Sequence, residues 1–166
     1  METKERNLYK LDELSDYKIA SNYSDVRGWK IVDADNRTIG TIDNLWVNKE
    51  MQRVIYLDVK LDKKLIEDKH KEVHDAIAYD NGKEFVYKDG DSHIIIPIGS
   101  VNINSDTKTV MANGIGYDTF RNTSRYHRDQ NFDRNYERNV MRSYYPAFNY
   151  ENDDDGFYNH KEFDNR

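Results

Sequence analysis

The chain has 166 residues, which gives room for one modest domain of about 100–150 residues and an appendage. Its formal net charge of -6 argues against a protein that binds nucleic acid or an anionic membrane through its overall field. The absence of cysteine excludes disulfides, thiolate nucleophiles and cysteine-ligated metal centres, so histidine and carboxylates are the remaining candidate metal ligands.

The N-terminal residues 1–18 are charged throughout and lack the apolar core of about 7–15 residues that a secretory signal needs. Within them, Leu11 and Leu14 are three residues apart, which favours a short helical turn over residues 8–14. The most apolar run of the chain, residues 94–98, is far shorter than the roughly 20 residues of a membrane-spanning helix. We therefore expect a cytoplasmic protein without a membrane span.

Three consecutive strands with polar turns between them are predicted for residues 25–61. Apolar and β-branched residues cluster in three stretches, 29–32, 39–47 and 54–61. In the third stretch the side chains alternate, with the core face formed by Ile55, Leu57, Val59 and Leu61 and a mixed opposite face. The pattern is typical of a β-meander.

Further short strands follow this meander. Residues 63–78 are rich in charge and predict either a short helix or a long excursion. Asn81-Gly82 predicts a tight turn, and strands are expected at 84–88, 92–98, 101–104 and near 109–111. The total of about six or seven short strands, with at most one or two short helices, favours an all-β fold that closes or nearly closes into a small barrel.

The composition changes abruptly near Gly116. From residue 117 onward there is no Leu or Ile, although seven Tyr and five Phe lie there. A segment this poor in branched aliphatic residues cannot easily bury a core of its own. We therefore expect a barrel domain over residues 8–115 and an irregular segment over residues 116–166 that is mostly disordered or loosely docked.

The barrel region resembles the PRC-barrel family in the order and spacing of several short motifs. These are LDELSDY at 11–17, DVRGW at 25–29, VDAD at 32–35, IGTID at 39–43, VIYLDV at 54–59 and IPIG at 96–99. The family takes its name from the cytoplasmic domain of the photosynthetic reaction-centre H subunit and includes the C-terminal domain of the ribosome maturation factor RimM. The resemblance implies a small β-barrel used for protein contacts and supplies no catalytic residues.

Two sets of residues come nearest to a metal site. His70 and His74 are four residues apart, with acidic residues one turn earlier, but lysines crowd them and no third ligand is fixed. The spacing of an EF-hand loop is matched in part by Glu151, Asp153, Asp155 and Glu162, although Pro146 interrupts the entering helix. The expected result is therefore no metal and no cofactor. His93 is expected on a strand face rather than as a base, and no nucleophile pairs with it.

The sequence favours a non-enzymatic interaction module that forms a homodimer or docks on a protein partner. Aromatic and arginine contacts in the C-terminal segment are candidates for such docking, at Tyr126, Phe132, Arg134, Tyr136 and Arg138. The same residues leave single-stranded RNA binding as an alternative, because bases stack on aromatic rings and phosphates attract arginine. A photosynthetic reaction-centre-like accessory role in electron transport is a further alternative, implied by the family resemblance alone.

Overall fold

The structure is a computed structural model that describes residues 8–14, 25–62, 64–65, 77–80, 83–86, 92–127, 133–147 and 157–163. The strands in these parts of the chain are β1 (Tyr9–Lys10), β2 (Lys30–Val32), β3 (Thr38–Asn48), β4 (Arg53–Leu61), β5 (Ile77–Asp80), β6 (Lys83–Val86), β7 (Ser92–Pro97), β8 (Val101–Asn104), β9 (Thr109–Ala112) and β10 (Tyr126–His127). The helices are α2 (Tyr117–Asn122), α3 (Arg134–Tyr144) and the 3-10 turns η1 (Leu11–Glu13), η2 (Ile98–Ser100), η3 (Phe157–Asn159) and η4 (Lys161–Phe163).

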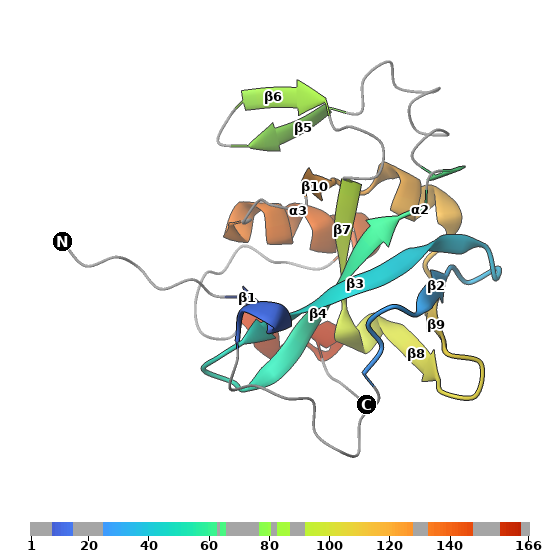
Figure 1. Ribbon diagram of the computed structural model, residues 1–166. Helices are drawn as coiled ribbons and strands as arrows, with labels where there is room; N and C mark the ends of the chain where they lie inside the picture. Colours follow the sequence, from blue (N-terminus) through green and yellow to red (C-terminus); the bar gives the residue numbers. More distant parts are fainter. Residues whose placement is uncertain are drawn as a thin grey trace.

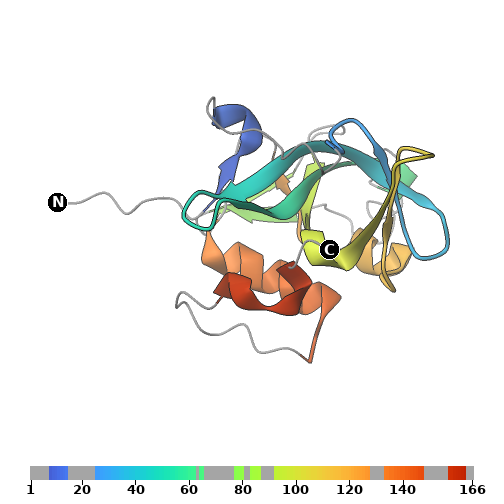
Figure 2. The same ribbon diagram turned by 90° about the horizontal axis from the view of Figure 1, so that it is seen from below.

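The strands form a curled eight-stranded sheet with the order β10-β7-β4-β3-β2-β9-β8, and β1 pairs with β3 beside this path. The predicted meander is confirmed, because β2 pairs with β3 and β3 with β4, both antiparallel. The only parallel pair described in this sheet joins β2 to β9. The sheet curves over the helices like a half-barrel (Figures 1 and 2). The predicted all-β class is therefore confirmed.

Two strands flank the turn predicted at Asn81-Gly82: β6 overlaps the predicted strand 84–88, whereas β5 begins at Ile77, in the segment for which the sequence predicts a short helix or a long excursion. β5 and β6 pair antiparallel in a separate two-stranded sheet, with Asp80 opposite Lys83. The turn residues themselves, and most of the segment 63–76, lie outside the described residues. In the parts of the chain that the structure describes, no helix is long and apolar enough to cross a lipid bilayer.

Both faces of β4 are buried, which differs from the mixed second face that the sequence predicts. Every residue from Ile55 to Val59 is buried. Alternation places Tyr56 and Asp58 on the face opposite Leu57. The Tyr56 hydroxyl donates to Glu137 of α3, and Asp58 accepts from the Tyr126 hydroxyl of β10. Elements from the C-terminal part of the chain therefore cover this second face.

The described residues after Gly116 share one hydrophobic core with the sheet, which differs from the expected loose or disordered segment. Their buried members are Tyr117, Phe120, Tyr126, Val140, Met141, Tyr144, Phe157, Tyr158 and Phe163. Figure 2 shows α3 and the last 3-10 turns lying beneath the sheet. The physical reason is that aromatic side chains bury large areas, and here they do so against strands that already form a core. The domain boundary near residue 116 stays a prediction.

A close backbone approach joins η2 to η4. A Cβ added at Gly99 would lie 2.5 Å from the carbonyl oxygen of Glu162, closer than real Cβ atoms come. Only glycine therefore allows η4 to pack here without a shift of the backbone. This contact ties the end of the described chain to the turn between β7 and β8.

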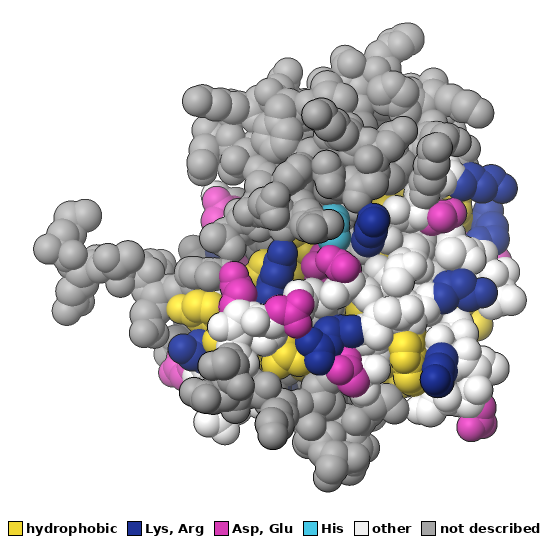
Figure 3. Space-filling view, viewed as in Figure 1, with side chains coloured by type: hydrophobic (Ala, Val, Ile, Leu, Met, Phe, Trp, Pro, Cys, Tyr) yellow, Lys and Arg dark blue, Asp and Glu magenta, His cyan; other side chains and the backbone are white. Residues whose placement is uncertain are grey.

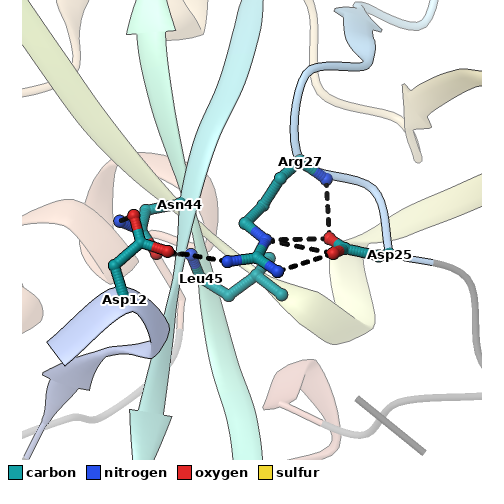
Figure 4. A network of polar contacts seen from close by, with 5 residues as sticks. All are labelled: Asp12, Asp25, Arg27, Asn44 and Leu45. Atoms are coloured by element: carbon teal, nitrogen blue, oxygen red, sulfur yellow. Dashed lines mark hydrogen bonds and ion pairs between the residues drawn. The ribbon is translucent and has the colours of Figure 1, made fainter. Parts of the chain in front are cut away.

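An ion-pair network joins η1 to the segment before β2 (Figure 4). Arg27 Nη1 lies 2.7 Å from Asp12 Oδ1, and Arg27 Nη2 lies 2.6 Å from Asp25 Oδ2. Asn44 of β3 donates to the other oxygen of Asp12 at 2.9 Å. The hydrogen bond from Arg27 lowers the pKa of Asp25, and the pKa of Arg27 is raised in turn.

We expect Arg27→Gln to lower the free energy of unfolding by less than about 1 kcal/mol at pH 7, because partly exposed ion pairs contribute little. The lowered pKa of Asp25 stabilises the fold above the carboxyl's ordinary value of 3.8, and this contribution is lost as pH falls through the folded-state value. Urea denaturation at pH 7 and at about pH 2.5 measures the difference. An equal loss at both pH values would contradict the ion pair as its source.

Candidate functional site

A buried polar cluster lies where β3, β4, β7 and β10 meet, and we call it the central cluster. Its members are Trp46, Asp58, His93 and Tyr126. The register of the strands brings them together. In the pairing of β4 with β7, Lys60 lies opposite His93, so Asp58, two residues before Lys60, lies on the same face as His93. In the pairing of β10 with β7, Tyr126 lies opposite His93. His93 Nδ1 lies 2.9 Å from Asp58 Oδ1, and both side chains are fully buried.

Hydrogen bonds within the central cluster orient Asp58. Its Oδ1 accepts from the Tyr126 hydroxyl, and that hydroxyl accepts from Trp46 Nε1 at 3.0 Å. Burial and the neighbouring Asp58 raise the pKa of Tyr126 well above its usual value, so its hydroxyl stays protonated and donates. Asp58 Oδ2 and His93 Nε2 are buried without a hydrogen-bond partner.

A second buried cluster, the Glu137 cluster, fastens α3 and η3 to β4. Glu137 Oε1 accepts from the Tyr56 hydroxyl at 2.8 Å and from the Tyr158 hydroxyl at 2.7 Å. Arg134 Nε donates to Glu137 Oε2 at 3.3 Å, and its guanidinium lies over the rings of Phe157 and Tyr158. Burial raises the pKa of Glu137, against the opposing effect of Arg134 and the two hydroxyls. The cluster joins residues that are far apart in the sequence.

The edge strand β8 is the most accessible strand of the sheet. It ends the strand order, and Asn102, Ile103 and Asn104 are exposed. Among the described residues the exposed large hydrophobic side chains are Ile103, at 39%, and Met111 of the neighbouring β9, at 38%. They line a hollow together with Lys30 and the turn after β8. In the part of Figure 3 where Figure 1 draws β8 and β9, hydrophobic and uncharged atoms lie beside basic side chains. We call β8 with Ile103 and Met111 the edge patch.

The backbone of β8 presents hydrogen-bonding groups to the open side. Asn113 N–H donates to the Ser100 carbonyl at 2.8 Å, next to the pair Val101 and Ala112. Hydrogen-bonded and non-hydrogen-bonded pairs alternate along an antiparallel ladder. Asn102 therefore bonds to β9, whereas Val101 and Ile103 turn their N–H and C=O groups outward. The outer edge is a template for another strand.

A family model described as PRC-barrel domain matches residues 19–116, which is more than half of the chain. The chain belongs to the PRC-barrel family. The match confirms the predicted resemblance, and its span ends just before α2. PRC barrels are in general non-catalytic modules. A comparison with curated proteins found no match.

Of the two weak candidate sets for a metal site, the described residues include Glu162 alone, so the expectation of no metal there stays a prediction. His70, His74, Glu151, Asp153 and Asp155 lie outside the described residues. The remaining candidate, Glu162, is buried in η4 at 5% exposure. The predicted strand position of His93 is confirmed, since it lies in β7.

The candidate docking residues belong to the contacts that hold the C-terminal elements on this PRC barrel. Tyr126 is buried in the central cluster, and Arg134 belongs to the Glu137 cluster. Tyr136 is half-buried and donates to the Ser124 carbonyl at 2.6 Å, while Arg138 bonds to Asn135 on its own helix at 2.7 Å. The remaining candidate, Phe132, lies outside the described residues.

Sequence reasoning missed the pairing of Asp58 with His93. The two residues are 35 positions apart and meet only through the register of β4 with β7. A usable signal existed in the sequence, because Asp58 interrupts an apolar strand and His93 opens the isoleucine run. A charged residue inside a buried strand usually has a partner.

Proposed function

We propose that this PRC barrel is a non-catalytic interaction module that self-associates through the edge patch. The observation that carries the proposal is that β8 ends the order of the described strands, with no described strand paired on its outer side, next to the exposed side chains of Ile103 and Met111. Open strand edges pair with other strands, and closed two-fold dimers are the commonest assemblies of identical chains. The partner is therefore a second copy of this chain.

The outward groups of β8 define the register of this dimer. Two antiparallel copies of β8 satisfy the outward N–H and C=O groups of Val101 with those of Ile103 in the other copy. The two-fold axis then passes beside Asn102. The strand has no charged residue, since it reads VNIN, so self-pairing places no like charges opposite each other. Ile103 and Met111 lose exposed apolar area in the same step.

Two variants test this dimer by size-exclusion chromatography with light scattering. The wild-type chain of 19.8 kDa is expected at twice this mass. Ile103→Lys places like charges across the interface, and Ile103→Pro removes an outward N–H without removing a bond to β9. We expect both variants to weaken the dimer at least about tenfold, which corresponds to about 1.4 kcal/mol.

Asn139→Lys is the matched control. Asn139 is exposed on α3, so this substitution adds the same positive charge away from the edge patch. It is expected to remain a dimer. A wild-type chain that is monomeric at every concentration, or an Ile103→Lys variant that stays dimeric, would contradict the proposal.

The other functions proposed from the sequence stay predictions. RNA binding through the C-terminal segment receives less support from the described contacts, because Tyr126 is buried and Arg134 bonds to Glu137. The face in Figure 3 shows acidic and basic side chains interspersed rather than one basic stripe. The reaction-centre-like accessory role has no support beyond family membership.

A further inference from the structure

We infer that docking of the C-terminal turn η4 holds the edge strand β8 in place and, given the dimer proposed above, regulates self-association. The 3-10 turn η2 ends at Ser100, and β8 begins at Val101 without an intervening residue. η2 contacts β4 on the sheet and η4 from the C-terminal part of the chain, and the two turns lie side by side in Figure 2. A shift of η2 therefore moves the start of the edge strand.

The contact between η2 and η4 is made by backbone on both sides. A Cβ added at Gly99 would lie 2.5 Å from the carbonyl oxygen of Glu162 and 2.7 Å from that of Lys161. Backbone atoms inside a turn cannot rotate away as the end of a long side chain can, so a displacement of one turn displaces the other. η4 is itself held on β4, because Phe163 is fully buried and its ring meets that of Tyr56 edge to face, with centroids 5.4 Å apart.

Ser100 joins the C-terminal elements to the first bond of the edge strand. Its hydroxyl shares a hydrogen bond with the hydroxyl of Tyr145, the residue that follows α3. Its carbonyl oxygen accepts from the Asn113 N–H at 2.8 Å, next to the pair of Val101 with Ala112. Burial raises the pKa of Tyr145, so this hydroxyl stays protonated at neutral pH. One residue therefore carries both the bond to the segment after α3 and the bond that begins the pairing of β8 with β9.

The short length of β8 makes its first bonds important for the dimer. The strand has four residues, and pairing with a second copy uses the outward groups of Val101 and Ile103. Strand ends open locally at a lower free energy than the centre of a sheet, and an end that opens no longer presents these groups in line. Docked η4 keeps this end of β8 closed, so the docked state is the one that dimerises. Because such coupling is reciprocal, dimerisation stabilises the docked η4 in turn.

The dissociation constant of the dimer in two variants of the full chain tests this regulation. Gly99→Ala forces η2 and η4 apart, and Tyr145→Phe removes the hydroxyl that bonds to Ser100 while it keeps the ring. By analytical ultracentrifugation we expect a dimer weakened at least about tenfold in Gly99→Ala and at least about threefold in Tyr145→Phe. Gly116→Ala is the matched control, because a Cβ there would meet no described atom within 4 Å and its φ of -91° suits other residues. We expect this control to dimerise as the wild type does.

A second measurement tests the hold on β8 without the dimer. Hydrogen exchange of the Asn113 N–H, followed by NMR on dilute protein, reports how often its bond to Ser100 opens. We expect this exchange to be faster in Gly99→Ala and Tyr145→Phe than in Gly116→Ala. Leu57 pairs with strands on both sides and reports global unfolding, so faster exchange at Asn113 than at Leu57 identifies local opening of the edge.

The two measurements separate this regulation from the dimer itself. A dimeric wild type whose dissociation constant and Asn113 exchange are unchanged in both variants would overturn the inference. A wild-type chain that is monomeric at every concentration would contradict the dimer, and the Asn113 exchange would then decide whether η4 holds β8.

Discussion

A chain that ends at residue 116 is expected to lose cooperative unfolding and to expose hydrophobic surface, although it contains the whole matched family segment. The described residues after 116 contribute nine buried side chains to the shared core, including Phe120, Tyr126 and Phe163. Burial of each large apolar side chain stabilises a protein by about 1.5–3 kcal/mol, and total stability is only about 5–15 kcal/mol. The loss therefore exceeds what the remaining sheet can tolerate.

Thermal unfolding followed by circular dichroism, together with binding of a hydrophobic dye, measures this effect. The dye is expected to bind the shortened chain, because the covered face of β4 with Tyr56 becomes exposed. A chain that ends at Phe163 retains every described element and is the control, with an unchanged melting temperature. A cooperative, wild-type-like transition of residues 1–116 would instead support the independent barrel that the composition predicted.

Glu137→Ala is expected to lower the free energy of unfolding by about 3–5 kcal/mol, because removal of one partner leaves the others buried without it. Tyr56 and Tyr158 lose the acceptor of their hydroxyl groups, and Arg134 loses its carboxylate. Glu137→Gln keeps an acceptor for both tyrosines and turns an amide toward Arg134, so we expect a smaller loss. Chemical denaturation of the two variants measures the difference.

Asn139→Ala, on an exposed position of the same helix, is the control for Glu137→Ala and is expected to change stability by less than about 0.5 kcal/mol. A loss in Glu137→Ala no larger than in this control would show that the buried cluster does not stabilise the docked helix.

The pH dependence of the free energy of unfolding also tests the role of Glu137. Burial raises the pKa of Glu137 above the ordinary value of 4.5, so the folded protein holds this proton more tightly than the unfolded chain. Its contribution is fully present below about pH 4.5 and is lost as pH rises through the raised folded-state pKa. We expect the free energy of unfolding to fall with rising pH over this range in the wild type, but not in Glu137→Gln. Equal slopes in both proteins would assign the effect to another group.

The strands of the sheet were predictable because the sequence signals for strands and turns involve only neighbouring residues. Alternation of Ile55, Leu57 and Val59 marks a strand face, and Asn81-Gly82 marks a turn, without knowledge of distant residues. The small barrel followed from the number of such strands and from the family motifs. The cover of its second face was not predicted, because the absence of Leu and Ile after residue 116 says only that this segment cannot build a core alone.

The candidate sites depend on register, which the sequence does not specify between distant strands. His93 approaches Asp58 because β7 lies beside β4 rather than β3. A shift of one residue would place these side chains on the other face. The edge patch depends likewise on β8 being last in the strand order, which follows from topology rather than from its own residues.

The parallel pairing of β2 with β9 has a consequence for the order of folding. Lys30 pairs with Thr109, so this contact closes a loop that contains most of the barrel. During synthesis the strands β2, β3 and β4 can pair with one another as soon as they emerge. The backbone groups on the other edge of β2 stay unpaired until β9 has been synthesised. Contacts between distant residues slow folding, and uncovered edges in the meantime favour aggregation. We therefore expect the emerging chain to be most prone to misassembly between completion of β4 and arrival of β9.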